Sequence, residues 1–151
     1  MTILRNVIFK SAAFNTTEPK DYFINECCFG DDVARWLTQE LRSRGVHTEP
    51  EPGQEDFGWY VTFRIGEAEY DFVIGYRPGE DEQLGDWMCT IERRAGLIGS
   101  VFGARKREIP VEAAQAIHGV LSTSPQIMDL LWFTDQDYAR EENGRSAPTT
   151  C

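Results

Sequence analysis

Cys28 is the residue whose type and setting best suit covalent chemistry in this chain. It shortly precedes Gly30 and Asp31, where the sequence predicts that a helix begins. A helix N-terminus lowers the pKa of a nearby thiol and so favours the nucleophilic thiolate. Asp31 and Asp32 oppose that ionisation, and no histidine lies nearby in the sequence. Cys28 is therefore a candidate nucleophile, but we favour the interpretation of a thiol without a catalytic role.

Carboxylates are the second group of side chains whose type suits catalysis or ligand binding, and they gather in two loops. The first loop carries Glu49, Glu51, Glu55 and Asp56, and the second carries Glu80, Asp81 and Glu82. Paired carboxylates support general acid–base catalysis or hold a hard cation, although the EF-hand spacing is absent. If these loops have a function beyond solvation, the sequence favours a surface that binds a basic protein partner.

The glycine-rich segment 96–107 ends in the cationic residues Arg105, Lys106 and Arg107. Its pattern matches neither the phosphate loop GxxxxGK[ST] nor the dinucleotide-binding fingerprint GxGxxG. Backbone amides beside cationic side chains still bind anions, so an anion-binding or docking loop stays open as an alternative to a plain connector.

The cysteine and histidine pattern gives no support to a metal or cofactor site. Besides Cys28 the chain has Cys27, Cys89 and Cys151, with only His47 and His118 as possible co-ligands. No CxxC pair is present, which disfavours zinc. We predict no metal and no cofactor, and reduced thiols in a cytoplasmic protein.

Charge and composition narrow the classes of partner. The 151 residues are 41% hydrophobic and carry a net charge of −10, which indicates a folded acidic protein. An acidic surface disfavours nucleic acid and anionic membranes. No apolar run approaches the ~20 residues of a membrane span, and Arg5 and Lys10 interrupt the N-terminal apolar residues where a signal peptide needs continuity. We predict one domain over residues 1–142 and a flexible tail over 143–151; the oligomeric state is left open.

The residues 57–76 predict the scaffold that positions these groups. Apolar residues alternate on both sides of the turn Gly66-Glu67, which is typical of a β-hairpin with a two-residue loop. The expected register pairs Ile65 with Ala68, Phe63 with Tyr70, Val61 with Phe72 and Trp59 with Ile74, and sets Arg64 opposite Glu69. All the apolar side chains, from Phe57 onward, are then expected on one face, with Trp59, Phe63, Tyr70 and Phe72 in the core.

Other patterns complete the expected fold. Strands are predicted over 3–9, 46–48 and 87–91, a first helix from Asp31 to Gly45, and a second helix after Pro110. The second helix buries Ala113, Ala114, Ile117, Val120 and Leu121, and a short helical turn follows Ser124-Pro125. We predict an α+β two-layer sandwich, with an antiparallel sheet of about four strands and two main helices packed on one face.

Two sequence blocks resemble a family of small uncharacterised bacterial proteins. They are CCFGDDVARWL, which begins at Cys27, and EPGQEDFGWY, which begins at Glu51. The resemblance implies a compact bacterial α+β domain and supplies no activity or site residues. In size and charge the chain is also similar to acidic immunity proteins that neutralise toxins.

The function expected from these patterns is that of a non-enzymatic, acidic, protein-binding domain of the immunity-inhibitor type. Glu49, Glu51, Glu55, Asp56, Glu80, Asp81 and Glu82 are the expected partner-binding residues. An enzyme that uses Cys28 or the carboxylates, and an anion-binding module that uses residues 96–107, stay open as alternatives.

Overall fold

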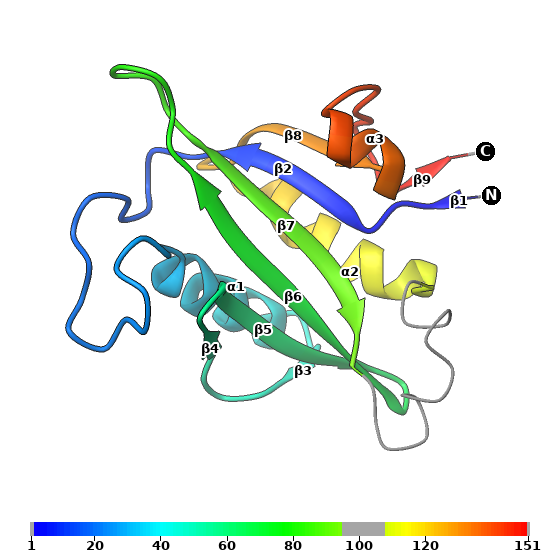
Figure 1. Cartoon of the computed structure of the whole chain (residues 1–151). Helices are drawn as coiled ribbons and strands as arrows, with labels where there is room; N and C mark the ends of the chain where they lie inside the picture. Colours follow the sequence, from blue (N-terminus) through cyan, green and yellow to red (C-terminus); the bar gives the residue numbers. More distant parts are fainter. Residues whose placement is uncertain (1, 95–107, 151) are drawn as a thin grey trace.

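An antiparallel sheet with helices packed against it forms the body of the molecule (Figure 1). The computed structural model describes residues 2–94 and 108–150. The candidate cations Arg105, Lys106 and Arg107 lie outside these residues. Within the described residues, no helix combines the length and apolar character required to cross a membrane.

The predicted hairpin is confirmed residue by residue. Strands β5 (Gly58–Ile65) and β6 (Ala68–Arg77) pair antiparallel, and Arg64 faces Glu69. The four apolar pairs expected from the alternation are all present. Gly66 at the turn has a φ of +62°, a left-handed conformation that suits glycine. Local alternation and a two-residue turn therefore determine this register.

The sheet is larger than the sequence patterns indicate. Its described strands number seven, with the order β3-β5-β6-β7-β2-β8 and with β4 paired to β5. The further members are β2 (Asn6–Lys10), β3 (His47–Thr48), β4 (Gly53–Glu55), β7 (Asp86–Arg93) and β8 (Met128–Phe133), and β1 (Thr2–Ile3) pairs separately with β9 (Thr149–Thr150). The prediction of about four strands was wrong because β4 has no alternating apolar pattern and β8 is a short apolar run that we assigned to a helical turn.

Two long helices, α1 (Asp31–Ser43) and α2 (Val111–Thr123), lie side by side on one face of the sheet, as Figure 1 shows. The buried side of α2 consists of the five predicted residues, Ala113, Ala114, Ile117, Val120 and Leu121. The short helix α3 (Asp135–Arg140) lies beside β2 and β8, and the Thr134 hydroxyl caps it by accepting a hydrogen bond from the Asp137 amide.

The core lies between the sheet and the two long helices. Trp59, Phe63, Tyr70 and Phe72 are buried there, as predicted. Phe57 is an exception to the expected apolar face, because 55% of its surface is exposed. It precedes β5 in the turn that follows β4, so it lies outside the regular alternation of the strand.

The C-terminal residues form backbone hydrogen bonds with the rest of the fold, and the flexible tail expected from residue 143 stays a prediction. Trp132 and Arg145 exchange two backbone hydrogen bonds of 2.7 and 2.8 Å. The Leu4 amide donates to the Pro148 carbonyl at 2.6 Å, and Pro148 is buried. Backbone pairing of this kind is independent of side-chain hydrophobicity, so the polar composition of the segment gives no sign of it.

Asp86 holds together the start of β7, the end of β6 and β2. Its carboxylate accepts hydrogen bonds from Lys10 at 2.7 Å and from Arg77 at 2.6 Å. Burial would raise the pKa of Asp86, but the hydrogen bonds from these two cations outweigh burial, and the net effect is a lowered pKa. The ionised form of Asp86 therefore stabilises the folded state.

We expect Asp86→Asn to lower the free energy of unfolding by about 1–2 kcal/mol at neutral pH, because two charge-assisted hydrogen bonds are weakened. Because the folded pKa lies below the unfolded value of about 3.9, this stabilisation is present above that pH and disappears as pH falls through the folded pKa. Urea unfolding of both proteins across this range measures the difference. Glu67→Gln, at the exposed hairpin turn, is the control. Its difference in unfolding free energy from wild type should not change as pH falls through this range.

Candidate functional site

The loop before α1 lies along the turn between β4 and β5. The Gln54 side chain accepts a hydrogen bond from the Ile24 amide at 2.6 Å and donates one to the Tyr22 carbonyl at 3.0 Å. Farther along, the Trp59 indole N–H donates to the Cys28 carbonyl at 3.0 Å. These contacts fix residues 22–28 against the sheet edge, although the two segments are about thirty residues apart in sequence.

Exposed apolar side chains lie on both segments of this junction. Tyr22 is 52% exposed and Ile24 61%, and both belong to the segment that Gln54 holds. Phe57, in the adjoining turn, is 55% exposed. The other large apolar side chains exposed in the described residues are Leu84, Met128 and Leu131, which lie elsewhere in the fold. Exposed aromatic and aliphatic side chains on adjoining segments are typical of an interaction surface.

Acidic residues accompany these apolar side chains. Asp21 and Glu26 belong to the loop, Glu55 and Asp56 belong to the turn, and all four are exposed. We define the turn patch as Tyr22, Ile24 and Phe57 together with Asp21, Glu26, Glu55 and Asp56. An apolar surface with an acidic surround is complementary to a protein surface that presents apolar and cationic side chains.

A buried carboxylate lies behind the turn patch, at the first residue of α1. Asp31 is only 5% exposed, and the Tyr22 hydroxyl donates a hydrogen bond to its Oδ2 atom. Among the described residues no donor reaches the other oxygen, Oδ1, which is itself buried. Tyr22 packs edge-to-face against Trp59, with ring centroids 6.1 Å apart, so one side of this aromatic ring contacts the core while its hydroxyl covers Asp31.

Cys28 lies within this region, but among the described residues no neighbour lowers the pKa of its thiol. Burial raises its pKa, and the neighbouring Cys27 and Asp56 raise it further. Its thiol donates a long hydrogen bond of 3.6 Å to the Asp56 carbonyl. A raised pKa keeps the sulfur protonated, which is the form without nucleophilic reactivity. The geometry therefore favours a packed thiol over a catalytic one.

The structure separates the acidic residues that the sequence grouped together. Glu55 and Asp56 belong to the turn patch, whereas Glu80, Asp81 and Glu82 belong to the β6–β7 turn, whose tip Figure 1 shows well away from β4. Glu49 is exposed in the loop after β3. Glu51 pairs with Arg35 of α1 at 2.7 Å, so its charge is partly compensated within the chain.

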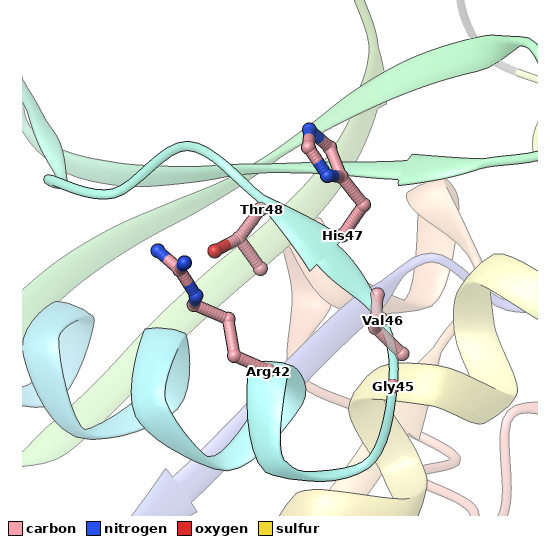
Figure 2. Close-up of a pocket in the computed structure, with 5 residues that line it drawn as sticks. All are labelled: Arg42, Gly45, Val46, His47 and Thr48. Atoms are coloured by element: carbon pink, nitrogen blue, oxygen red, sulfur yellow. The ribbon is translucent and has the colours of Figure 1, made fainter.

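A second hollow lies where α1 is followed by β3, and its lining includes an arginine and a histidine. It has a volume of about 250 Å³ and is lined by Arg42, Gly45, Val46, His47 and Thr48. Figure 2 shows Arg42 and the Thr48 hydroxyl on the side of β3 toward α1, with His47 pointing to the other side. The Thr48 hydroxyl donates to the Glu49 carbonyl at 2.9 Å. The Arg42 and His47 side chains do not converge on one point, so this hollow has no preformed anion site.

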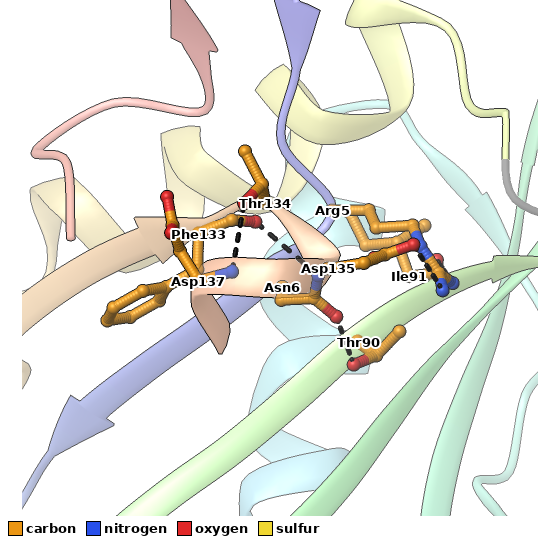
Figure 3. Close-up of polar contacts among 8 residues, drawn as sticks. All are labelled: Arg5, Asn6, Thr90, Ile91, Phe133, Thr134, Asp135 and Asp137. Carbon is orange, nitrogen blue, oxygen red and sulfur yellow. Dashed lines mark hydrogen bonds and ion pairs between the residues drawn. The ribbon is translucent and has the colours of Figure 1, made fainter. Parts of the chain in front are cut away.

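A polar cavity of about 320 Å³ lies between the sheet and α3. Its walls include Arg5, Asn6, Thr90 and Asp135, which bond to one another as Figure 3 shows. Arg5 donates to both Asp135 oxygens, at 2.8 and 3.3 Å, and the Asn6 amide donates to Asp135 at 2.8 Å. The Thr90 hydroxyl donates to Asn6 at 2.8 Å. This network fixes α3 on the sheet, and the donors of Arg5 and Asn6 are used within it.

Comparisons with known proteins give no family for this chain: no protein-family model, curated protein or solved structure matches it. The described residues contain no group of three or more histidine, cysteine or acidic side chains arranged to hold a metal ion. The turn patch is therefore the strongest candidate site, since it combines exposed apolar side chains, exposed carboxylates and backbone segments held by hydrogen bonds. Sequence reasoning identified Glu55 and Asp56 but missed Tyr22 and Ile24, whose only signal was an apolar type inside a polar loop.

Proposed function

We propose that this chain is a non-enzymatic binding domain that recognises a basic protein through the turn patch. One observation carries the proposal: two adjoining backbone segments, held in place by hydrogen bonds, expose three large apolar side chains and four carboxylates. The apolar residues supply buried contact area, and the carboxylates steer a cationic partner and form the rim.

Inhibition of a basic enzyme or toxin is the form of binding that suits this surface best. A rigid apolar centre loses little conformational entropy on association, which favours tight complexes. An excess of ten negative charges accelerates encounter with a cationic partner at low salt. Tight binding and fast encounter are both typical of an inhibitor that must bind its partner before the partner acts.

The test compares two variants that remove the same charge from different loops. The turn-patch variant carries Glu26→Gln, Glu55→Gln and Asp56→Asn, and the control carries Glu80→Gln, Asp81→Asn and Glu82→Gln. Each changes the net charge from −10 to −7, because three carboxylates are neutralised. Wild type and both variants serve as baits for quantitative affinity capture, and association rates with any captured protein are then measured against ionic strength.

We expect the turn-patch variant to associate about tenfold more slowly at low salt, with a weaker salt dependence, and the control to stay close to wild type. Phe57→Ala should accelerate dissociation, because it removes exposed apolar area from the turn patch. If both charge variants associate equally slowly, the effect is due to net charge and not to the turn patch. If only the control associates more slowly, the interface lies at the β6–β7 turn. Either result overturns the assignment to the turn patch.

A further inference from the structure

The environment of Asp31 leaves half of a buried carboxylate without a hydrogen-bond donor. Its Oδ2 atom accepts the Tyr22 hydroxyl, while no donor from the described residues reaches Oδ1. A buried polar atom without a partner costs free energy, and a charged one costs more. Such an atom, behind an exposed patch, is suited to a ligand that brings its own N–H donors.

The local charge favours a cation in spite of the helix N-terminus. Asp31 and Asp32 both lie in the first turn of α1. Their two negative charges exceed the roughly half positive charge that a helix dipole places at this end. The field at Oδ1 therefore attracts a cation.

Tyr22 is the group that an incoming cation must displace. Its hydroxyl covers Asp31, but about half of its side chain is exposed and no secondary structure confines it. The hydrogen bond to Asp31 raises the pKa of Tyr22, so its hydroxyl stays protonated and remains a neutral donor. A cationic donor forms a stronger bond to a carboxylate than a neutral hydroxyl does.

We propose that Asp31 is the anchor carboxylate of the turn patch and receives one arginine side chain of the partner, which replaces the Tyr22 hydroxyl. This inference rests on the proposed function. Arginine fits better than lysine because its planar fork donates to both carboxylate oxygens at once. The half-exposed ring of Tyr22 next to the site also provides a face on which a guanidinium stacks.

Arg35 is a cation close to the proposed anchor, and Glu51 restrains it. Its Nη1 atom donates to Glu51 at 2.7 Å, while its charge is close enough to Tyr22 to lower the pKa of that hydroxyl slightly. Without Glu51, the guanidinium of Arg35 is free to turn toward Asp31 and compete with an incoming arginine. Glu51 thus acts through Arg35 as a positioning residue.

The test uses N-acetyl-arginine methylamide as the probe and N-acetyl-citrulline methylamide as its neutral isostere. The Trp59 indole N–H resonance, together with the amides of residues 22–31, reports binding by NMR, because that indole bonds to Cys28 beside the site. Each probe is titrated into wild type, Asp31→Asn, Tyr22→Phe and Glu51→Gln. Thermal unfolding of each variant establishes that it is folded.

We expect weak saturable shifts with the arginine probe and none with citrulline. Tyr22→Phe should bind about fivefold more tightly, since a competing hydrogen bond of about 1 kcal/mol is removed while the ring remains. Glu51→Gln should bind more weakly than wild type, and Asp31→Asn should lose the shifts. The opposite signs of the Asp31 and Tyr22 effects are not reproduced by general loosening of the loop.

Equal arginine affinity in wild type and Asp31→Asn overturns the proposal, as does weaker binding by Tyr22→Phe. If Asp31→Asn fails to fold, the Tyr22→Phe result decides alone, because the half-exposed Tyr22 ring is retained. The turn-patch charge variant separates this inference from the proposed function. If the arginine probe binds but partner capture does not depend on the turn patch, the protein-binding function is refuted and the anchor site stands. If partner capture depends on the turn patch but the probe does not bind, only the anchor is refuted.

Discussion

Asn6→Asp is expected to destabilise the fold by about 3–5 kcal/mol at neutral pH, because it places an uncompensated charge at a buried position. Asn6 is 2% exposed, and its side-chain amide donates to Asp135 at 2.8 Å and to the Phe133 carbonyl at 3.4 Å. An aspartate presents an oxygen to both acceptors. Arg5 already donates to Asp135 and to the Ile91 carbonyl, so it is poorly placed to neutralise a second carboxylate.

The loss of unfolding free energy in Asn6→Asp should depend on pH, and the direction of this dependence identifies the charge of the new carboxylate as the cause. Burial and the adjacent Asp135 both disfavour ionisation, so the folded pKa of the new carboxyl is raised above its unfolded value of about 3.9. The protonated acid donates to Asp135 as the amide did. Stability therefore recovers as pH falls through the raised pKa, and the gap to wild type is smallest below the unfolded pKa.

Urea unfolding of wild type, Asn6→Asp and Asn6→Leu over a series of pH values measures this effect. Asn6→Leu removes the same hydrogen bonds without adding charge, and we expect a loss of about 1–3 kcal/mol with little pH dependence. If the difference in unfolding free energy between wild type and Asn6→Asp stayed constant from neutral to acid pH, the like-charge explanation would be contradicted.

The network around Asn6 also marks the limit of what the sequence predicts. Asn6 and Asp135 are 129 residues apart, and Asn6 and Thr90 are 84 apart. Neither separation leaves a local pattern, since hydrophobic periodicity reports only on neighbours along the chain. The hairpin is the opposite case, because its alternation and its turn lie within twenty consecutive residues and determine the pairing completely.

The same contrast holds for the candidate site. The carboxylates of the turn patch are evident from composition, and we identified Glu55 and Asp56 on that basis. The placement of Tyr22 and Ile24 beside them depends on two hydrogen bonds to Gln54, a residue of β4. β4 itself consists of Gly53, Gln54 and Glu55, which have no strand preference, so its pairing comes from tertiary context. The burial of Asp31 beneath the Tyr22 hydroxyl likewise has no sequence signature.

Gly58 connects the stability of the sheet to the turn patch, and Gly58→Ala is expected to lower the free energy of unfolding by about 3–4 kcal/mol. Its φ of +139° lies in a region that is essentially restricted to glycine, which accounts for about 1–3 kcal/mol. An added Cβ atom would also lie 2.8 Å from the Ile74 carbonyl oxygen. That oxygen belongs to the backbone of β6, a strand paired on both sides, so it has little freedom to move away.

Gly45→Ala is the matched control for this substitution. Gly45 has a φ of +84°, but a Cβ atom added there meets nothing within 4 Å. It therefore isolates backbone strain without a clash, and we expect a loss of about 1–2 kcal/mol. Thermal or urea unfolding measures both variants, and equal losses would show that the contact with Ile74 is relieved by a small shift of the strand.

The position of Gly58 means that its substitution should also disturb the turn patch. Gly58 lies between Phe57, whose side chain the patch exposes, and Trp59, whose indole bonds to the Cys28 carbonyl. Displacing this residue to relieve the clash changes both neighbours, so we expect the Trp59 indole resonance to shift in Gly58→Ala while the protein is still folded. In Gly45→Ala the same resonance should stay in place, because Gly45 follows the far end of α1. A shift of the Trp59 indole resonance in Gly58→Ala, without a shift in Gly45→Ala, would show that the exposed apolar residues depend on the conformation that only glycine permits at the start of β5.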